Sequence, residues 1–230
     1  MSATAASADD SRQLEFSDWY SALPGAIRTA IGAQARIREY RSARIVRSLG
    51  DGHTLDFVVR GAVRVDVGEG KTARTVCYLA PGTWFADPGI LLDSRRLFSL
   101  VAHGASVLRS VSASDLSTVR QDPCLVQAIA RLNFTQAVQA ATLLQETSSS
   151  TLRTRLAASL RRLSSDFGVR VDPHHLQIAL EIRQGDLGKM VGACRQRINA
   201  ELKTFEREGI LSLNRYITVT DLPALERVAA

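Results

Sequence analysis

The stretch 184–209 constrains this chain most, because it predicts two short helices joined by a tight turn. Two sets of apolar residues recur there at the three- and four-residue spacing of one helical face. These are Leu187, Met190 and Val191, followed by Ile198, Leu202 and Phe205. Gly192 lies between the two sets and suits a turn. Both stripes can be buried against each other only if the helices cross steeply, so the sequence predicts a helix-turn-helix.

The second of these helices keeps a polar face beside its apolar stripe. The side chains that point away from the stripe are Gln196, Asn199, Ala200 and Lys203, with Arg195 and Arg197 on the flanks. Arginine matches the two acceptors on a guanine edge, and asparagine and glutamine match adenine in the major groove. The pattern therefore predicts a helix that reads DNA bases.

The composition is that of a globular protein without a disulfide framework. The 230 residues are 45% hydrophobic, and 29 basic against 23 acidic residues give a net charge of +6. This charge suits a polyanionic partner but does not identify one. Cys77, Cys124 and Cys194 are widely spaced, which fits a reducing cytosol. We find neither an apolar run near the ~20 residues of a membrane helix nor a signal-peptide pattern, and expect a cytoplasmic protein without a membrane partner.

The first part of the chain changes from a tail to helices and then to strands. Residues 1–13 predict a flexible tail, and apolar spacing from Phe16 to Leu23 and at Ile27 and Ile31 predicts two helices. Short apolar or alternating runs then continue to about Val111. Many short strands at ~8–12-residue spacing predict an antiparallel barrel or sandwich. The predicted strands are Arg44–Leu49, Leu55–Arg60, Ala62–Val67, Arg74–Leu79 and Phe98–Val101.

A long helix is predicted from Asp122 to about Glu146, because Asp is a favoured N-cap and Pro a favoured first helical residue. About 25 residues would span ~37 Å at 1.5 Å per residue. A buried core helix is the simpler interpretation, but the position between a strand-rich region and a helix-turn-helix favours a dimer helix. The Ser/Thr cluster Thr147–Thr151 predicts a hinge, with Ser150 or Thr151 capping the next helix.

The remaining segments predict one more helix and two short hairpins. Leucines line one face of the helix that follows the hinge, and we expect its arginines to form a solvated face. These arginines are Arg153, Arg155, Arg161 and Arg162. Strands at Val169–Val171 and Leu176–Leu180 precede the helix-turn-helix, and strands at Ile210–Leu213 and Tyr216–Val219 follow it. The turn at Asn214 and Arg215 is a candidate wing.

This order of elements resembles the Crp/Fnr family of bacterial transcription regulators over about residues 14–222. The matching stretches are Leu152–Ala157, Asp186–Arg195 and Glu208–Asp221, with Val59–Val65 and Pro81–Phe85 in the first half. The resemblance implies an α+β chain with an antiparallel β-roll of the double-stranded β-helix or jelly-roll type. It implies a cyclic-nucleotide-binding-like sensor domain over 14–121, a dimerisation helix over 122–147 and a winged helix-turn-helix DNA-binding domain over 148–230.

The resemblance implies a homodimeric, sequence-specific transcription regulator that is not an enzyme. Its partners would be double-stranded operator DNA, a second copy of the chain and RNA polymerase. The base-contacting arginine of the family carries over to Arg195, whereas Gln196 and Ala200 stand where Glu and a second Arg are common, which implies a different operator. Arg183 and Cys194 replace capping Thr and Ser, each worth about 1 kcal/mol. The predicted DNA-binding residues are Arg195, Gln196, Arg197, Asn199, Lys203 and Arg215.

The effector site departs further from the family pattern. Cyclic-nucleotide-binding members carry Gly-Glu and then Arg-Ser or Arg-Thr, whose Glu takes the ribose hydroxyl and whose Arg takes the phosphate. The corresponding candidates are Asp87, Arg95 and Arg96, with Leu97 in place of the hydroxyl residue. A cyclic nucleotide, another nucleotide effector or no effector all stay open.

No nucleophile–base arrangement or metal-ligand cluster is visible in the sequence, and His53 and His103 are isolated. We therefore predict no catalytic residues and no metal site. The competing hypothesis is an effector-binding regulatory module whose winged domain contacts protein rather than DNA.

Overall fold

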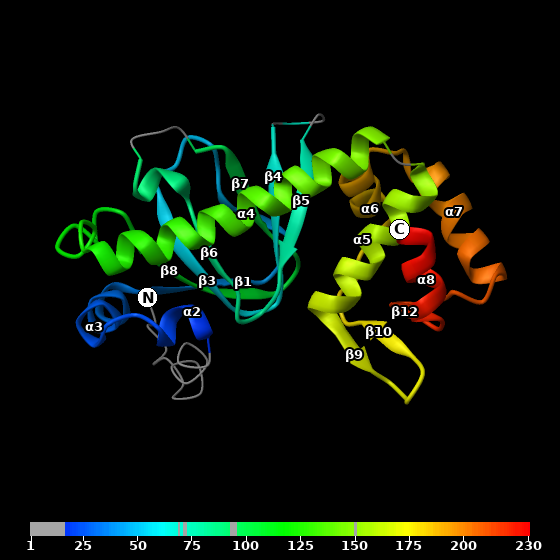
Figure 1. Ribbon diagram of the computed structural model, residues 1–230, viewed down its shortest axis with the longest axis horizontal. Helices are drawn as coiled ribbons and strands as arrows, with labels where there is room; N and C mark the ends of the chain where they lie inside the picture. The colour runs from blue at the N-terminus through cyan, green and yellow to red at the C-terminus, as the bar shows by residue number, and fades with distance from the viewer. Residues whose placement is uncertain (1–16, 69, 71–72, 93–95, 150) are drawn as a thin grey trace. The chain divides into compact units, whose positions relative to one another are not determined.

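The computed structural model describes residues 17–68, 70, 73–92, 96–149 and 151–230. The chain divides into two compact units (Figure 1). The first comprises residues 1–68 and 78–139, and the second residues 69–77 and 140–230. The predicted tail 1–13 and the candidate Arg95 lie outside the described residues.

The strand-rich half forms two four-stranded sheets whose described pairings are antiparallel. The order of the first sheet is β1 (Arg36–Tyr40), β8 (Ser106–Ser112), β3 (Thr54–Arg60) and β6 (Trp84–Ala86). The order of the second is β2 (Arg44–Arg47), β7 (Phe98–Ala102), β4 (Val63–Val67) and β5 (Arg74–Leu79). Together with the helices described below, this arrangement confirms the predicted α+β fold class.

The five predicted strands occur within a few residues of their expected bounds, but strands β1, β6 and β8 were not predicted. β1 has the sequence RIREY, and four of its five residues are exposed, so it lacks the apolar alternation that marks a strand. It becomes a strand because it pairs with β8 along its whole length, from Arg36 opposite Ser110 to Tyr40 opposite Ser106. Backbone hydrogen bonds between distant segments therefore override the local pattern.

One face of the first sheet packs against helices through a cluster of aromatic side chains. The ring centroid of Trp84 lies 5.0 Å from that of Trp19, 5.6 Å from that of Tyr20 and 4.9 Å from that of Phe57. Trp19 Nε1 donates a hydrogen bond to the Ala128 carbonyl at 2.9 Å. Helices α2 (Asp18–Ser21), α3 (Gly25–Gln34) and the start of α4 (Pro123–Ser149) thus cover this face. The opposite face is left for the polar residues described below, since side chains alternate along a strand.

The second unit contains the predicted winged helix-turn-helix. Its helices are α5 (Leu152–Phe167), α6 (Gln184–Val191), α7 (Arg195–Arg207) and α8 (Leu222–Ala229). Its sheet has the order β11 (Leu211–Leu213), β12 (Ile217–Val219), β10 (Leu176–Ile178) and β9 (Gly168–Arg170). In the described part of the chain, no helix is both long enough and apolar enough to span a bilayer.

The Ser/Thr cluster between α4 and α5 is less of a break than the sequence predicted. α4 continues through Ser149, so Thr147 to Ser149 are helical rather than part of a hinge. Propagating a helix adds one backbone hydrogen bond per residue, which outweighs the weak helix preference of Ser and Thr. Thr151 is the N-cap of α5, and its hydroxyl accepts a hydrogen bond from the Thr154 amide at 3.2 Å.

Candidate nucleic-acid interface and effector region

The turn between α6 and α7 depends on two glycines. Gly192 ends α6 in the left-handed conformation, with φ 69° and ψ 43°, which is strained for other residues. Gly188 lies one turn earlier, and its carbonyl accepts a hydrogen bond from the Ala193 amide at 3.0 Å. A Cβ atom on Gly188 would lie 2.5 Å from the Ala193 carbonyl oxygen. The backbone of the turn therefore packs directly against the helix at Gly188.

We expect Gly188→Ala to push the turn away from α6 and to destabilise the second unit by about 1–3 kcal/mol, because overpacked sites cost that much. Gly185→Ala is the matched control, since a Cβ there would meet no atom within 4 Å and alanine favours helix. Thermal unfolding followed by circular dichroism measures both changes. Equal stability of the two variants would contradict the close packing at Gly188.

Helix α7 buries its apolar stripe and exposes most of the predicted DNA-binding residues. Ile198, Leu202 and Phe205 are buried. The exposed predicted residues on this helix are Arg195, Gln196, Arg197 and Lys203. Arg207 is also exposed and lies four residues after Lys203. It is therefore a cation on the outward face that the sequence prediction omitted.

Asn199 is half-buried because it faces α6. Its Oδ1 accepts a hydrogen bond from Gln184 Nε2 at 2.9 Å, and Arg195 Nε donates to Gln184 Oε1 at 3.4 Å. Gln184 thus links two of the predicted base-reading residues across the two helices. The sequence prediction missed Gln184 because its position as the first residue of α6 carries no helical periodicity.

Arginines of α5 position α7 instead of forming only a solvated face. Arg153 forms ion pairs with Glu201, at 3.9 Å, and with Glu208. Its guanidinium carbon also lies 4.6 Å from the centroid of the Phe205 ring. Arg155 Nε donates a hydrogen bond to the carbonyl of Val191, the last residue of α6, at 3.1 Å. The expectation of a solvated face is therefore wrong for these two residues, because α7 and the turn pack onto α5.

The wing residue Arg215 is paired with an acidic residue. Its Nη2 lies 3.3 Å from Glu181 Oε2, and the two side chains are 74% and 57% exposed. An exposed pair of this kind stabilises by about 1 kcal/mol or less. The turn at Asn214 and Arg215 joins β11 to β12 as predicted, and Arg215 can exchange its partner at little energetic cost.

Helices α6 and α7 both begin without a capping hydroxyl, as the residues Arg183 and Cys194 at these positions imply. Cys194 makes no side-chain cap bond at the start of α7. At the start of α6, Asp186 Oδ2 instead accepts a hydrogen bond from the Arg183 amide at 3.2 Å. The carboxylate at the third helical position therefore takes over part of the capping.

The effector candidates Asp87 and Arg96 lie together, but they bind each other. Both side chains are 0% exposed, and Asp87 Oδ2 lies 3.2 Å from Arg96 Nε. Asp87 Oδ1 contacts His53 Nδ1 at 2.6 Å and accepts a hydrogen bond from the Gly89 amide at 2.9 Å. Arg96 Nη2 donates to the Gly52 carbonyl at 2.7 Å. Burial lowers the pKa of the Arg96 guanidinium, and the nearby carboxylates, Asp87 first, act to raise it.

A second carboxylate extends this buried network. Asp56 Oδ2 accepts a hydrogen bond from the Thr54 hydroxyl at 2.6 Å, and Asp56 Oδ1 accepts one from Ser110. Arg47 Nη2 lies 3.6 Å from Asp56 Oδ1, and Arg47 Nε donates to Thr54 Oγ1 at 3.3 Å. Two arginines and two aspartates, counting Asp87 and Arg96, therefore balance their charges inside the unit.

The sequence prediction missed Asp56, Arg47 and His53 as members of this network. The available signal was an aspartate inside the otherwise apolar strand Leu55–Arg60. Among the described residues, no group of three or more His, Cys, Asp and Glu side chains is placed to hold a metal ion.

Comparisons with known proteins agree with this architecture. Residues 154–228 match the family model described as the Crp-like helix-turn-helix domain. The chain is similar to the structure of FixK2 from Bradyrhizobium japonicum, with a TM-score of 0.74, 19% identity and coverage of 85% of this chain and 98% of that one. It is also similar to CLP, described as a c-di-GMP responsive global regulator of Xanthomonas campestris (TM-score 0.71, 19% identity, coverage 85% and 99%).

A CooA variant from Carboxydothermus hydrogenoformans is similar over 91% of this chain and 92% of its own, with a TM-score of 0.68 and 19% identity. No curated protein matches the sequence. A further similar structure, with a TM-score of 0.66 and 20% identity, is described as a transcriptional regulator of the CRP/FNR family from Thermus thermophilus; it matches over 84% of this chain and 98% of its own. By these matches, residues 154–228 correspond to a Crp-like helix-turn-helix domain, and the chain as a whole has the fold of solved transcription regulators of the CRP/FNR family.

Proposed function

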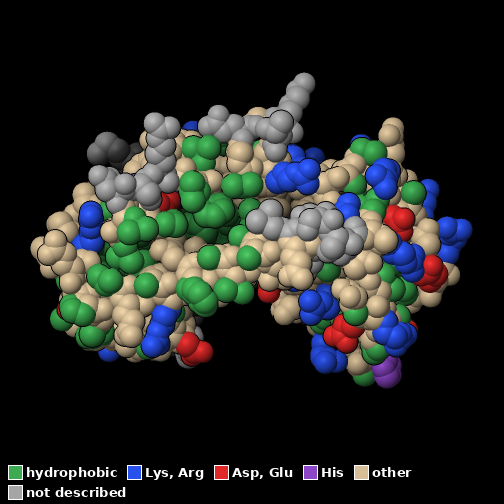
Figure 2. Space-filling model, turned by 45° about the horizontal axis from the view of Figure 1, so that its top comes forward, with side chains coloured by type: hydrophobic (Ala, Val, Ile, Leu, Met, Phe, Trp, Pro, Cys, Tyr) green, Lys and Arg blue, Asp and Glu red, His purple; other side chains and the backbone are tan. Residues whose placement is uncertain are grey.

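We propose that this protein is a sequence-specific DNA-binding transcription regulator that acts as a homodimer in the cytoplasm, where its DNA lies. One observation carries the proposal: Arg195, Gln196 and Lys203 are exposed on the second helix of a Crp-like helix-turn-helix. Lys and Arg side chains are spread over the visible face of the second unit (Figure 2), which suits a phosphate backbone.

The exposed side chains divide into two roles. Arg195 would pair with a guanine edge, and Gln196 and Asn199 would meet adenine edges. Arg197, Lys203 and Arg215 would neutralise phosphates and set the position of the helix on the duplex. Gln184 would hold Arg195 and Asn199 in place through the two hydrogen bonds described above.

Selection from a random-sequence DNA library tests this function directly. The purified protein should enrich a two-fold symmetric motif. Its affinity for the selected site should fall steeply with salt, because binding releases counterions from the phosphates and this release becomes less favourable at high salt. A scrambled site of equal length and composition is the control. Failure to enrich any motif, together with salt-independent binding, would instead favour a winged domain that contacts protein.

We propose the domain division suggested by the sequence, with residues 14–121 as the sensor, 122–147 as the dimerisation helix and 148–230 as the DNA-binding domain. Phe134 and Val138 lie one helical turn apart on α4 and are 71% and 48% exposed. Hydrophobic side chains gather over α4 and the neighbouring part of the first unit (Figure 2). Large apolar side chains exposed in one stripe favour pairing with a second copy of the helix.

We expect sedimentation to show a dimer at micromolar concentration and Phe134→Glu/Val138→Glu to give a monomer, because charges are costly in an apolar helix interface. The control is Thr135→Glu/Gln139→Glu, which adds the same charge at two other exposed positions of α4. A monomeric wild-type protein, or a variant that still dimerises, would contradict the role of this stripe.

The sensor domain would modulate DNA affinity and transcription by RNA polymerase. CLP is described as responsive to c-di-GMP, and a solved structure of CprK as complexed with OCPA, so proteins of this fold take different ligands. A cyclic nucleotide is a poor candidate at Asp87 and Arg96, because these two side chains already form a buried ion pair with each other. Any nucleotide phosphate there would have to displace a buried ion pair.

A further inference from the structure

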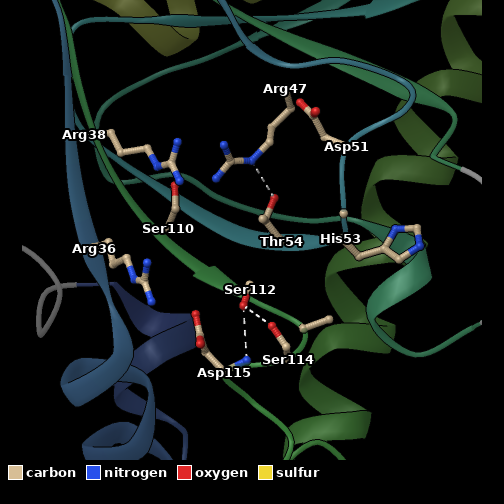
Figure 3. A pocket seen from close by; sticks show the side chains of 12 residues that line it. Arg36, Arg38, Arg47, Asp51, His53, Thr54, Ser110, Ser112, Ser114 and Asp115 are labelled. Atoms are coloured by element: carbon tan, nitrogen blue, oxygen red, sulfur yellow. Dashed lines mark hydrogen bonds between the residues drawn. The ribbon is translucent and has the colours of Figure 1, made fainter.

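A pocket of about 550 Å³ opens in the first unit beside strand β1 (Figure 3). Arg36 and Arg38 lie two residues apart on β1, so both point to one face of the sheet. Arg36 is opposite Ser110 on β8, and Ser112 is opposite Thr54 on β3. The pocket is thus lined by arginines and hydroxyls from three adjacent strands, a size and polarity that suit a small ligand.

The floor of the pocket is formed by Arg47, Thr54 and Ser110, and the charge of Arg47 is compensated by Asp56 beneath it. The Arg47 side chain is 8% exposed and lies against Asp56, while its Nε donates to Thr54. Asp56 in turn accepts hydrogen bonds from Thr54 and Ser110. Because these side chains satisfy one another's hydrogen bonds, the floor of the pocket is held in a fixed shape.

Arg36 and Arg38 form the rim of the pocket, and their guanidinium groups are less constrained than that of Arg47. Neither Arg36 nor Arg38 forms a hydrogen bond or an ion pair within 4.0 Å with another described residue, and both are exposed. Two carboxylates also line the pocket, and both accept hydrogen bonds from neighbouring groups. Asp51 Oδ2 accepts from the Ser48 amide at 2.7 Å, and a hydrogen bond from Ser112 lowers the pKa of Asp115, with a smaller contribution from Arg36.

The polar groups of this pocket that lack a hydrogen-bond partner are therefore mostly donors. Two guanidinium groups present up to ten N–H donors, and Figure 3 shows both heads turned toward the space between the strands, near the hydroxyls of Ser110 and Ser112. Guanidinium groups bind planar or tetrahedral oxyanions through paired, charge-assisted hydrogen bonds. We propose that Arg36 and Arg38 bind a small ligand that carries a carboxylate or phosphate group in this pocket.

This site differs from the one that the family resemblance implies. Asp87 and Arg96 do not line the pocket, and their charges are already paired with each other. The site would supply the effector for the sensor role proposed above, but the binding itself does not depend on DNA recognition. A titration without DNA therefore tests the site separately from the proposed function.

The experiment is calorimetric titration of the full-length protein with inorganic phosphate and, separately, with citrate. Sodium chloride keeps the ionic strength constant, since screening alone changes any weak anion binding. The test variant is Arg36→Ala/Arg38→Ala. The matched control is Arg41→Ala/Arg44→Ala, which removes the same charge from exposed positions that do not line the pocket.

We expect saturable binding at one site per chain, weakened by about tenfold or more in Arg36→Ala/Arg38→Ala and unchanged in the control, because the variant removes the charge-assisted hydrogen bonds that the two guanidinium groups would donate. Binding of phosphate alone assigns a phosphorylated ligand, and binding of citrate alone assigns a carboxylate. Absence of saturable binding of both anions at millimolar concentration, or equal weakening in the two variants, would overturn the proposal. The arginines would then serve only to protect an exposed edge strand.

Discussion

Arg195→Ala should lower the affinity for the selected DNA site by about 1–3 kcal/mol, roughly 5- to 150-fold, and lower the affinity for random DNA far less. The reason is that a bidentate arginine–guanine pair discriminates between bases, whereas loss of one exposed charge weakens phosphate binding uniformly. Arg195 is exposed at the first position of α7. Fluorescence anisotropy on the selected and scrambled duplexes at one fixed salt concentration measures both affinities.

Two controls separate base reading from charge and from folding. Arg161→Ala removes the same charge from an exposed position on α5 and should weaken the two duplexes equally and slightly. Gln184→Ala removes the side chain that accepts from Arg195 and donates to Asn199, so it should reduce selectivity without removing a base contact. Equal loss on both duplexes in Arg195→Ala would reject its base-reading role.

The second large effect concerns the stability of the first unit. Asp87→Ala should destabilise it by about 3–5 kcal/mol, because the Arg96 guanidinium would remain buried without its counter-charge. The substitution also removes the acceptor for the Gly89 amide and the partner of His53. At about 2–4 °C per kcal/mol, we expect the melting temperature to fall by roughly 6–20 °C.

Tryptophan fluorescence reports this unit selectively, because the protein's two tryptophans, Trp19 and Trp84, lie in contact in the first unit. Asp87→Ala/Arg96→Met should recover most of the lost stability, since removing both charges leaves no unpaired ion. Asp51→Ala, at the exposed loop, is the control and should change stability little. A double variant as unstable as Asp87→Ala would mean that the cost arises from lost packing rather than from an unpaired charge.

The helix-turn-helix could be predicted from sequence because its determinants are local. The apolar spacing in α6 and α7 and the glycine at position 192 act within a few residues of each other, and the structure has both helices there. The residues that set the helices in position are less local. Arg153 lies 55 residues before its partner Glu208, and Arg155 lies 36 residues before Val191.

The first unit shows the same limit more strongly. Asp87 and Arg96 were candidates from the sequence, but their mutual pairing and the contact of Asp87 with His53, 34 residues away, were not predictable. Ser110 and Asp56 are 54 residues apart and meet only because β8 pairs with β3. Strand register thus decided which polar residues share a face, and local spacing contains no information on that register.

The sequence alone determined the helix-turn-helix, the order of its surrounding elements and the resemblance to the Crp/Fnr family, because periodicity and turn chemistry act over short distances. Only the tertiary structure decided that Asp87 and Arg96 neutralise each other and that Arg36 and Arg38 keep unpaired guanidinium groups. The physical reason is that pairing of buried charges depends on which strands are neighbours, and neighbouring strands here come from distant parts of the chain.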